Sequence, residues 1–250
     1  MNFQTAKNLE AQCKNKSIEV ISRVSFLGDP RDAIKALQRQ DARIIVGMFY
    51  SAAARMVMCE AYKHGLYGKK FVWFLIGWYE DNWYSNDLQS INCTLNEMET
   101  VLNGHFTTEA LMWNQDDVTP TISGLNMKQW IQLYKMNLMN YSSLGQPEGY
   151  QEAPLAYDAI WAIAKALNQT IIQLEKQDKQ IESFNYHSNG ITNVIKHQLQ
   201  NIDFLGVSGK VLFSEAGDRI AWTLIEQMKD GIYYKIGFYD IKTENLTWNS

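Results

Sequence analysis

The chain is 250 residues long; 46% of its residues are hydrophobic, and 23 basic against 27 acidic residues leave a net charge of -4. That length and apolar content can bury the core of one large domain or two small ones, so a folded globular protein is the default expectation. No cluster of lysine and arginine is present that would follow a phosphate backbone, so nucleic acid is not an expected partner.

Helix and strand patterns alternate over the first 113 residues, with short turns between them. This alternation predicts an α/β fold with a parallel sheet covered by helices on both faces. The apolar run at residues 71–76 is too short for a helix and is typical of a strand buried on both sides. In chain order, we expect helices at residues 5–16, 30–38, 51–64 and 95–103, and strands at residues 18–26, 42–50, 71–76 and 105–113.

The pattern changes after residue 113. A polar stretch precedes an amphipathic helix, and the glycine-, proline- and serine-rich residues 142–149 are typical of a crossing between domains. We therefore expect two regions, with the chain passing between them more than once. The further elements expected are helices at residues 127–139, 154–167 and 191–200 and antiparallel strands at residues 211–213, 219–225 and 232–239.

Five asparagines fit the N-glycosylation acceptor pattern: Asn15, Asn92, Asn140, Asn168 and Asn245. The longest apolar run, residues 71–79, is far shorter than the ~20 residues of a membrane-spanning helix, and the polar N-terminus lacks a signal-peptide core. Those two features alone predict a soluble cytoplasmic protein. The acceptor patterns instead favour a secreted or extracellular one.

Three cysteines leave one unpaired if a disulfide forms. Cys59 falls late in the expected helix 51–64, and Cys93 follows the strand 71–76, so neighbouring units could bring the two together. A bridge would close a loop of about 35 residues and contribute on the order of 4 kcal/mol. The alternative of two reduced, buried thiols stays open from the spacing, and Cys13 is expected to pack within a helix.

Large aromatic residues close two consecutive expected strands: Tyr50 is the last residue of the strand at 42–50, and Trp78 comes just after the strand at 71–76. Ligands bind at the carboxyl ends of open parallel sheets, and aromatic faces attract methylene chains and cations, so an amine ligand would suit these positions. The alternative is that both side chains simply cover the sheet edge. Glu152, just before the helix at 154–167, either stabilises the helix dipole or awaits a ligand ammonium.

Enzyme signatures are mostly absent. Residues 206–210 lack the spacing of a phosphate-binding loop and are more typical of a turn before a strand. There is no Gly-x-Ser-x-Gly elbow, and the four histidines lack metal-ligand spacing with the cysteines. We therefore expect no catalytic residue, no metal site and no cofactor.

Several long segments carry a more specific resemblance. Together they closely resemble the extracellular domains of the metabotropic GABA-B receptor family, and the match runs nearly end to end. The resemblance implies an α/β fold of the periplasmic-binding-protein-like type 1, a bilobed Venus flytrap closed by a small ligand. The segments that carry it are residues 39–47, 68–79, 90–94, 151–161 and 221–227.

The resemblance also implies an organisation for the chain, which would be a fragment holding mostly the second lobe and part of the first. Residues 1–140 would form the second lobe as an α/β parallel sheet. Residues 150–205 would be a return segment into the first lobe, and residues 206–250 a crossover and the terminal second-lobe strands.

The same resemblance implies ligand-binding roles for Tyr50, Trp78 and Glu152 and a disulfide between Cys59 and Cys93. Glu152 would bind the ammonium of GABA and Trp78 would pack on its methylenes. The Tyr50 hydroxyl would donate to the GABA carboxylate as the lobes close. Retention of all three residues favours the ligand-binding subtype 1 over its non-binding partner subtype.

In the full-length receptor, the resemblance implies that this region lies on the extracellular side of the plasma membrane. Subtype 2 would be its heterodimer partner, and a membrane domain absent from this chain would couple to a G protein. A soluble amino-acid- or solute-binding protein of the same architecture is the main alternative. An α/β enzyme is the third possibility.

Overall fold

The computed structural model describes residues 3–80, 82–141, 149–187 and 189–249. The chain divides into two compact units. Unit 1 comprises Met1–Glu109, Leu224–Tyr239 and Leu246–Ser250, and unit 2 comprises Ala110–Thr223 and Asp240–Asn245. The chain therefore passes between the units more than once, as the changing sequence pattern predicts. Most of the expected crossing segment, residues 142–148, lies outside the described residues.

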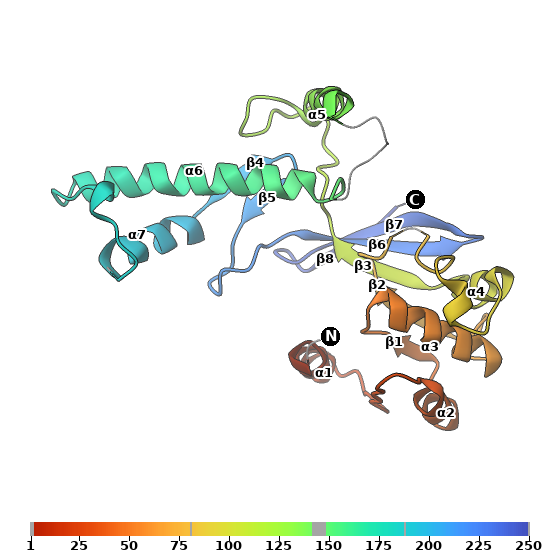
Figure 1. The fold of residues 1–250 in the computed structure, drawn as a ribbon. Coiled ribbons are helices and arrows are strands. Elements are labelled where there is room, and N and C mark those ends of the chain that lie inside the picture. Colours follow the sequence, from red (N-terminus) through yellow and green to blue (C-terminus); the bar gives the residue numbers. More distant parts are fainter. Residues whose placement is uncertain (1–2, 81, 142–148, 188, 250) are drawn as a thin grey trace. The chain divides into compact units, whose positions relative to one another are not determined.

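A six-stranded sheet organises unit 1 (Figure 1), with the strand order β1-β2-β3-β6-β7-β8. The first three strands are parallel. Strand β6 runs antiparallel to β3, because the backbone at residue 104 bonds to that at 228 while the backbone at 111 bonds to that at 222. The sheet is therefore mixed, with a parallel half and a meander. Its strands are β1 (Ile44–Val46), β2 (Val72–Ile76), β3 (Phe106–Ala110), β6 (Trp222–Lys229), β7 (Ile232–Asp240) and β8 (Asn245–Trp248).

Alternate residues of the parallel strands form the core of unit 1. Ile45, Trp73 and Leu75 are buried against residues of the helices in one hydrophobic cluster. On the opposite face of β1, Ile44 is 72% exposed and Val46 is 47% exposed. The expectation of helices on both faces is therefore wrong at this strand. The helices of this unit are α1 (Phe3–Asn15), α2 (Arg31–Arg39), α3 (Ser51–Lys63) and α4 (Leu95–Leu102).

The strand expected at residues 18–26 is absent, and this segment is irregular. Its apolar residues Ile18, Val20 and Ile21 are exposed. The prediction was wrong because apolar alternation is a local property, whereas a strand exists only where a neighbour completes its hydrogen-bond ladder. The strands expected at residues 42–50, 71–76 and 105–113 are present but shorter, whereas those expected at 219–225 and 232–239 are present and extend further, to Lys229 and Asp240.

Two local features define the start of a helix and a hairpin turn in unit 1. Thr94 and Glu97 form a capping box at α4, in which the Glu97 carboxylate accepts from the Thr94 backbone N–H at 2.7 Å. The turn between β6 and β7 consists of Asp230 (φ 52°) and Gly231 (φ 79°). Positive φ at both central residues is the requirement of a tight hairpin whose twist matches the flanking strands.

Unit 2 is built around a long helix, α6 (Ala153–Glu175), which extends well beyond the expected end at residue 167. Ile171, Ile172 and Leu174 continue its apolar pattern past residue 167. Ala162 and Ala166 pack with Phe204 and Val211 in one core cluster. The other elements of this unit are α5 (Met127–Tyr141), α7 (Asn189–Gln200), β4 (Asp203–Gly206) and β5 (Gly209–Leu212).

A buried carboxylate fixes the β4–β5 hairpin on α6. Asp158 is buried and accepts hydrogen bonds from the backbone N–H of Val207 at 3.0 Å and of Ser208 at 2.7 Å, and from the Ser208 hydroxyl. A Cβ atom at Gly206 would lie 2.1 Å from the Asp158 carboxylate, so only glycine allows this approach. The segment 206–210 is thus a hairpin turn, as its sequence predicts. No helix among the described residues is long and apolar enough to cross a membrane.

Replacing Asp158 by alanine is expected to lower the free energy of unfolding by about 2–4 kcal/mol, because two buried backbone N–H groups and a hydroxyl lose their acceptor. Asp203→Ala is the matched control, because the Asp203 side chain forms an exposed ion pair with Lys210, and its loss is expected to cost less than about 1 kcal/mol. Denaturant unfolding of the secreted variants measures both changes. Equal losses would contradict an anchoring role for Asp158.

Candidate functional site

Tyr50 and Trp78 leave the sheet of unit 1 at the same edge. They follow β1 and β2, which are parallel neighbours with Val46 opposite Phe74. Tyr50 is the N-cap residue of α3 and is 63% exposed, while Trp78 is 56% exposed. This exposure does not support the alternative that the two side chains simply cover the sheet edge. Both rings are accessible to a ligand at the carboxyl ends of the strands.

Glycines let the chain turn tightly before each aromatic. A Cβ atom at Gly77 would lie 2.7 Å from Cβ of Glu109 and 3.0 Å from the Thr108 carbonyl carbon. A Cβ atom at Gly47 would lie 2.8 Å from Cδ2 of Leu75. At Gly77 the neighbours are a Cβ atom and backbone atoms, so a side chain there would displace the turn that carries Trp78. At Gly47 the neighbours are the ends of the Phe49 and Leu75 side chains, which can move aside.

A side-chain hydrogen bond joins the same two turns. The Tyr79 hydroxyl donates to the backbone carbonyl of Phe49. Burial raises the pKa of Tyr79 well above its ordinary value, so the hydroxyl keeps its proton and remains a donor. The sequence shows both residues but does not reveal this contact, because it depends on how the two turns approach.

Glu152 lies in unit 2, at the N-cap position of α6, where its backbone is helical and its side chain makes no capping hydrogen bond. The carboxylate is exposed. The geometry therefore gives no support to a capping role, although a carboxylate at this position still interacts favourably with the helix dipole. The exposed carboxylate remains accessible to a cationic ligand.

An aromatic cluster, which the sequence did not reveal, supports the turn before Glu152. The Trp113 indole N–H donates to the Gln151 side chain at 3.1 Å, and the rings of Trp113 and Tyr150 lie 5.5 Å apart. Tyr134 stacks on both Tyr150, at 5.4 Å, and Trp130, at 5.1 Å. Trp113, the α5 pair Trp130 and Tyr134, and Tyr150 come from three separate stretches of the chain, so no local pattern could have grouped all of them.

Comparison with known families identifies the chain. Residues 4–231 match the family model described as the receptor family ligand binding region. The chain belongs to this family. The match agrees with the α/β sheet of unit 1 and assigns the periplasmic-binding-protein-like architecture that the sequence resemblance implied.

Curated relatives of this receptor ligand-binding region are named as GABA-B receptor subunits. The chain is 46% identical over 245 residues to gamma-aminobutyric acid type B receptor subunit 1 of Mus musculus, covering 98% of this chain and 25% of the relative. The corresponding subunit 1 of Caenorhabditis elegans is 47% identical over 247 residues, with 98% and 27% covered. Subunit 2 of Homo sapiens is 29% identical over 236 residues, with 92% and 24% covered. The chain thus spans about a quarter of the length of these receptors.

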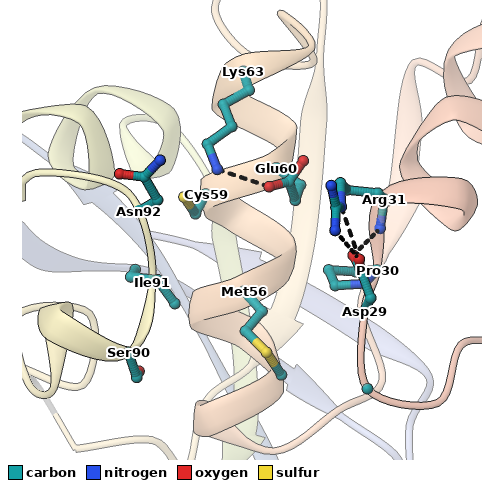
Figure 2. Close-up of a pocket in the computed structure, with 11 residues that line it drawn as sticks. Asp29, Pro30, Arg31, Met56, Cys59, Glu60, Lys63, Ser90, Ile91 and Asn92 are labelled. Carbon is teal, nitrogen blue, oxygen red and sulfur yellow. Dashed lines mark hydrogen bonds and ion pairs between the residues drawn. The ribbon is translucent and has the colours of Figure 1, made fainter.

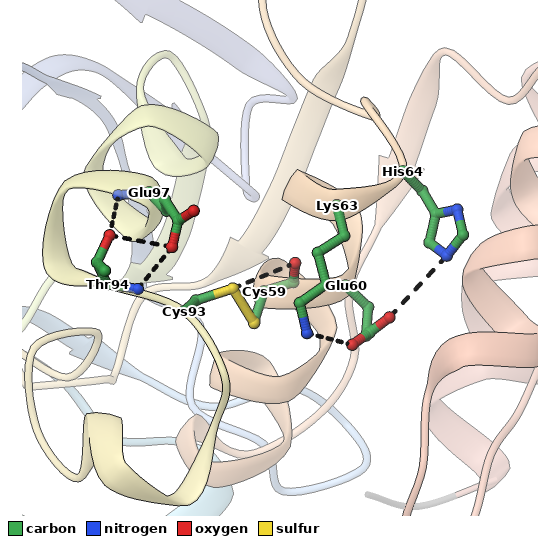
Figure 3. The surroundings of a disulfide bond; sticks show 7 residues. All are labelled: Cys59, Glu60, Lys63, His64, Cys93, Thr94 and Glu97. Carbon is green, nitrogen blue, oxygen red and sulfur yellow. Dashed lines mark hydrogen bonds and ion pairs between the residues drawn. A yellow bond between two sulfur atoms is a disulfide. The ribbon is translucent and has the colours of Figure 1, made fainter.

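The receptor ligand-binding region contains the disulfide that the resemblance implied, between Cys59 in α3 and Cys93 just before α4, with their Cα atoms 5.7 Å apart (Figure 3). The Thr94–Glu97 capping box starts α4 directly after Cys93. The bridge therefore holds α3, which begins after Tyr50, to the start of α4. Cys13 is the free cysteine and is half-buried.

A separate hollow of about 460 Å³ lies beside this disulfide (Figure 2). The charged groups on its wall are already paired, Arg31 with Asp29 at 2.7 Å and Lys63 with Glu60 at 2.7 Å. These pairs leave the wall near neutrality, which gives no preference for a charged ligand. We therefore do not assign a binding site here.

Among the described residues, no group of three or more histidine, cysteine, aspartate and glutamate side chains is placed to hold a metal ion. Four of the acceptor asparagines, Asn15, Asn92, Asn168 and Asn245, are exposed. The side chain of Asn140 lies outside the described part of the chain. Glycosylation at these positions stays a prediction.

A thiol count tests the cysteine pairing. The secreted protein, unfolded without reductant, is expected to show one free thiol per chain, from Cys13, when titrated with a thiol-specific chromogenic reagent. Cys13→Ser is the control and is expected to show none. Three thiols in the parent protein would contradict the disulfide.

Proposed function

We propose that the chain is the GABA-contacting part of a GABA-B receptor subunit 1. The observation that carries this proposal is the identity to subunit 1, 46% over 98% of the chain, against 29% over 92% to subunit 2. The exposure of Tyr50 and Trp78 at one sheet edge supports it further. In this proposal the region lies on the extracellular side of the plasma membrane, subunit 2 is its heterodimer partner, and a membrane domain outside this chain couples to a G protein.

GABA is a zwitterion whose ammonium and carboxylate are separated by three methylenes. The exposed Glu152 carboxylate would bind the ammonium through a charge-assisted hydrogen bond. The Trp78 ring would pack on the methylenes and the ammonium, with cation-π attraction of about 0.5–2 kcal/mol. The Tyr50 hydroxyl would donate to the carboxylate.

Activation requires that the ligand bind one conformation better than another. Tyr50 and Trp78 belong to unit 1, whereas Glu152 belongs to unit 2. A ligand held by all three residues would favour the closed arrangement over the open one by the free energy of the contacts that only closure completes. GABA would thereby shift the equilibrium toward closure.

The alternatives have less support. A soluble solute-binding protein would share the architecture, but the curated relatives matched are receptor subunits. These relatives are receptors rather than enzymes, so an enzymatic role has no supporting observation.

The test uses a chimera in which this chain replaces the matching 245-residue segment of mouse subunit 1, expressed with mouse subunit 2. Glu152→Ala is expected to weaken GABA binding by about 10- to 100-fold, because a charge-assisted hydrogen bond contributes about 1.5–3 kcal/mol. Trp78→Ala is expected to weaken it by about tenfold. Equilibrium binding of labelled GABA at the cell surface measures both changes.

Matched controls separate these effects from general damage. Trp248→Ala removes a tryptophan of equal exposure, 57%, from β8 of the same unit, and Glu182→Ala removes another exposed carboxylate from unit 2. Both controls are expected to bind GABA within about twofold of the parent chimera. Unchanged affinity in both Trp78→Ala and Glu152→Ala would overturn the site assignment.

A further inference from the structure

The turns that carry Tyr50 and Trp78 are held together at one point. The Tyr79 hydroxyl donates to the backbone carbonyl of Phe49. Phe49 directly precedes Tyr50, and Tyr79 directly follows Trp78. This hydrogen bond is therefore one residue away from each of the two proposed ligand aromatics.

The ring of Tyr79 is itself fixed by a buried neighbour. It meets the Trp83 ring edge to face, with the ring centroids 5.0 Å apart and the planes at 60°. Trp83 is among the most deeply buried large side chains of the chain, and its indole N–H donates to the Tyr233 hydroxyl at 3.1 Å. The orientation of Tyr79 thus depends on a packed core group rather than on solvent-exposed contacts.

The hydrogen bonds continue from Tyr233 to His105, and each group in the series donates to the next one. His105 Nδ1 lies 2.6 Å from the Leu102 carbonyl, which can only accept, so Nδ1 carries the proton. The unprotonated Nε2 then accepts from the Tyr233 hydroxyl at 3.2 Å. Burial lowers the pKa of His105 to about 4, so the ring stays neutral at neutral pH and this polarity is maintained.

A second contact joins Trp83 to α3, the helix whose N-cap residue is Tyr50. The guanidinium of Arg55, one turn into α3, donates from Nη1 to the Trp83 backbone carbonyl at 3.0 Å. Trp83 is therefore held through its indole to the sheet and through its backbone to α3. Trp83, which packs on Tyr79, is thus bonded both to the sheet and to α3, the two elements that define where Trp78 and Tyr50 lie.

We propose that Tyr79 is a positioning residue of the ligand site: its hydroxyl holds the Phe49–Tyr50 turn against the Trp78 turn, so that a ligand meets a preset aromatic pair. This role rests on the proposed function. Exposed side chains on untethered turns must lose conformational freedom when a ligand binds, which weakens binding. A hydroxyl that removes this freedom beforehand raises affinity without touching the ligand.

The test is Tyr79→Phe in the chimera with mouse subunit 2. The substitution removes one hydroxyl and keeps the ring against Trp83, and it is expected to weaken GABA binding by about tenfold. Tyr234→Phe is the matched control, because it removes the hydroxyl of a half-exposed tyrosine on β7 and is expected to change affinity by less than about twofold. Affinity is determined by equilibrium binding, so it does not depend on the number of receptors at the surface.

A double-mutant cycle distinguishes positioning from general stabilisation. In a Tyr50→Ala background there is no aromatic side chain left to position at that turn, so adding Tyr79→Phe is expected to cause less than about a twofold further loss. An undiminished tenfold loss in that background would show that Tyr79 acts on the fold in general and would overturn the proposal. Unchanged affinity of Tyr79→Phe in the parent would overturn it as well.

The outcome also separates this role from the function on which it rests. Unchanged affinity in both Trp78→Ala and Glu152→Ala overturns the site assignment, and the role of Tyr79 with it. Weaker binding in those two variants together with unchanged binding in Tyr79→Phe overturns the positioning role alone.

Discussion

Parallel pairing of β1 with β2 is the constraint on which the candidate site depends. Two strands that run in the same direction end at the same edge of a sheet, so Tyr50 and Trp78 emerge there together although 28 positions separate them. The pairing places Val46 opposite Phe74, which keeps Ile45 and Trp73 in the core. A slip of one residue would exchange the two faces of a strand and bury the wrong side chains.

Two buried polar groups, one in each unit, hold the segments next to the candidate ligand residues. His105 in unit 1 ends a chain of hydrogen bonds that reaches Trp83 through Tyr233, and Asp158 in unit 2 accepts three hydrogen bonds from the β4–β5 turn. Buried polar groups with satisfied partners specify one arrangement, because any alternative leaves a donor or acceptor unpaired. Each unit therefore holds its candidate ligand residues in a defined frame.

Recognition and conformational change make different demands on this protein. In the proposed receptor, recognition of a small zwitterion requires groups in fixed positions, to which Gly77, the Tyr79 hydroxyl and the Cys59–Cys93 bridge contribute within unit 1. Conformational change requires that some contacts form only in one state. In the proposed receptor, dividing the candidate ligand residues between two compact units meets both demands.

Sequence reasoning predicted the class of fold and the order of most elements, and it named Tyr50, Trp78 and Glu152 as candidate ligand residues. These predictions depend on periodicity and on a specific resemblance, both of which are readable along the chain. Sequence reasoning failed at residues 18–26, and it did not reveal the Tyr79–Phe49 hydrogen bond or the Trp113 cluster. These features arise only in the folded chain, because strand pairing, close turns and buried hydrogen bonds join residues whose proximity no local pattern encodes.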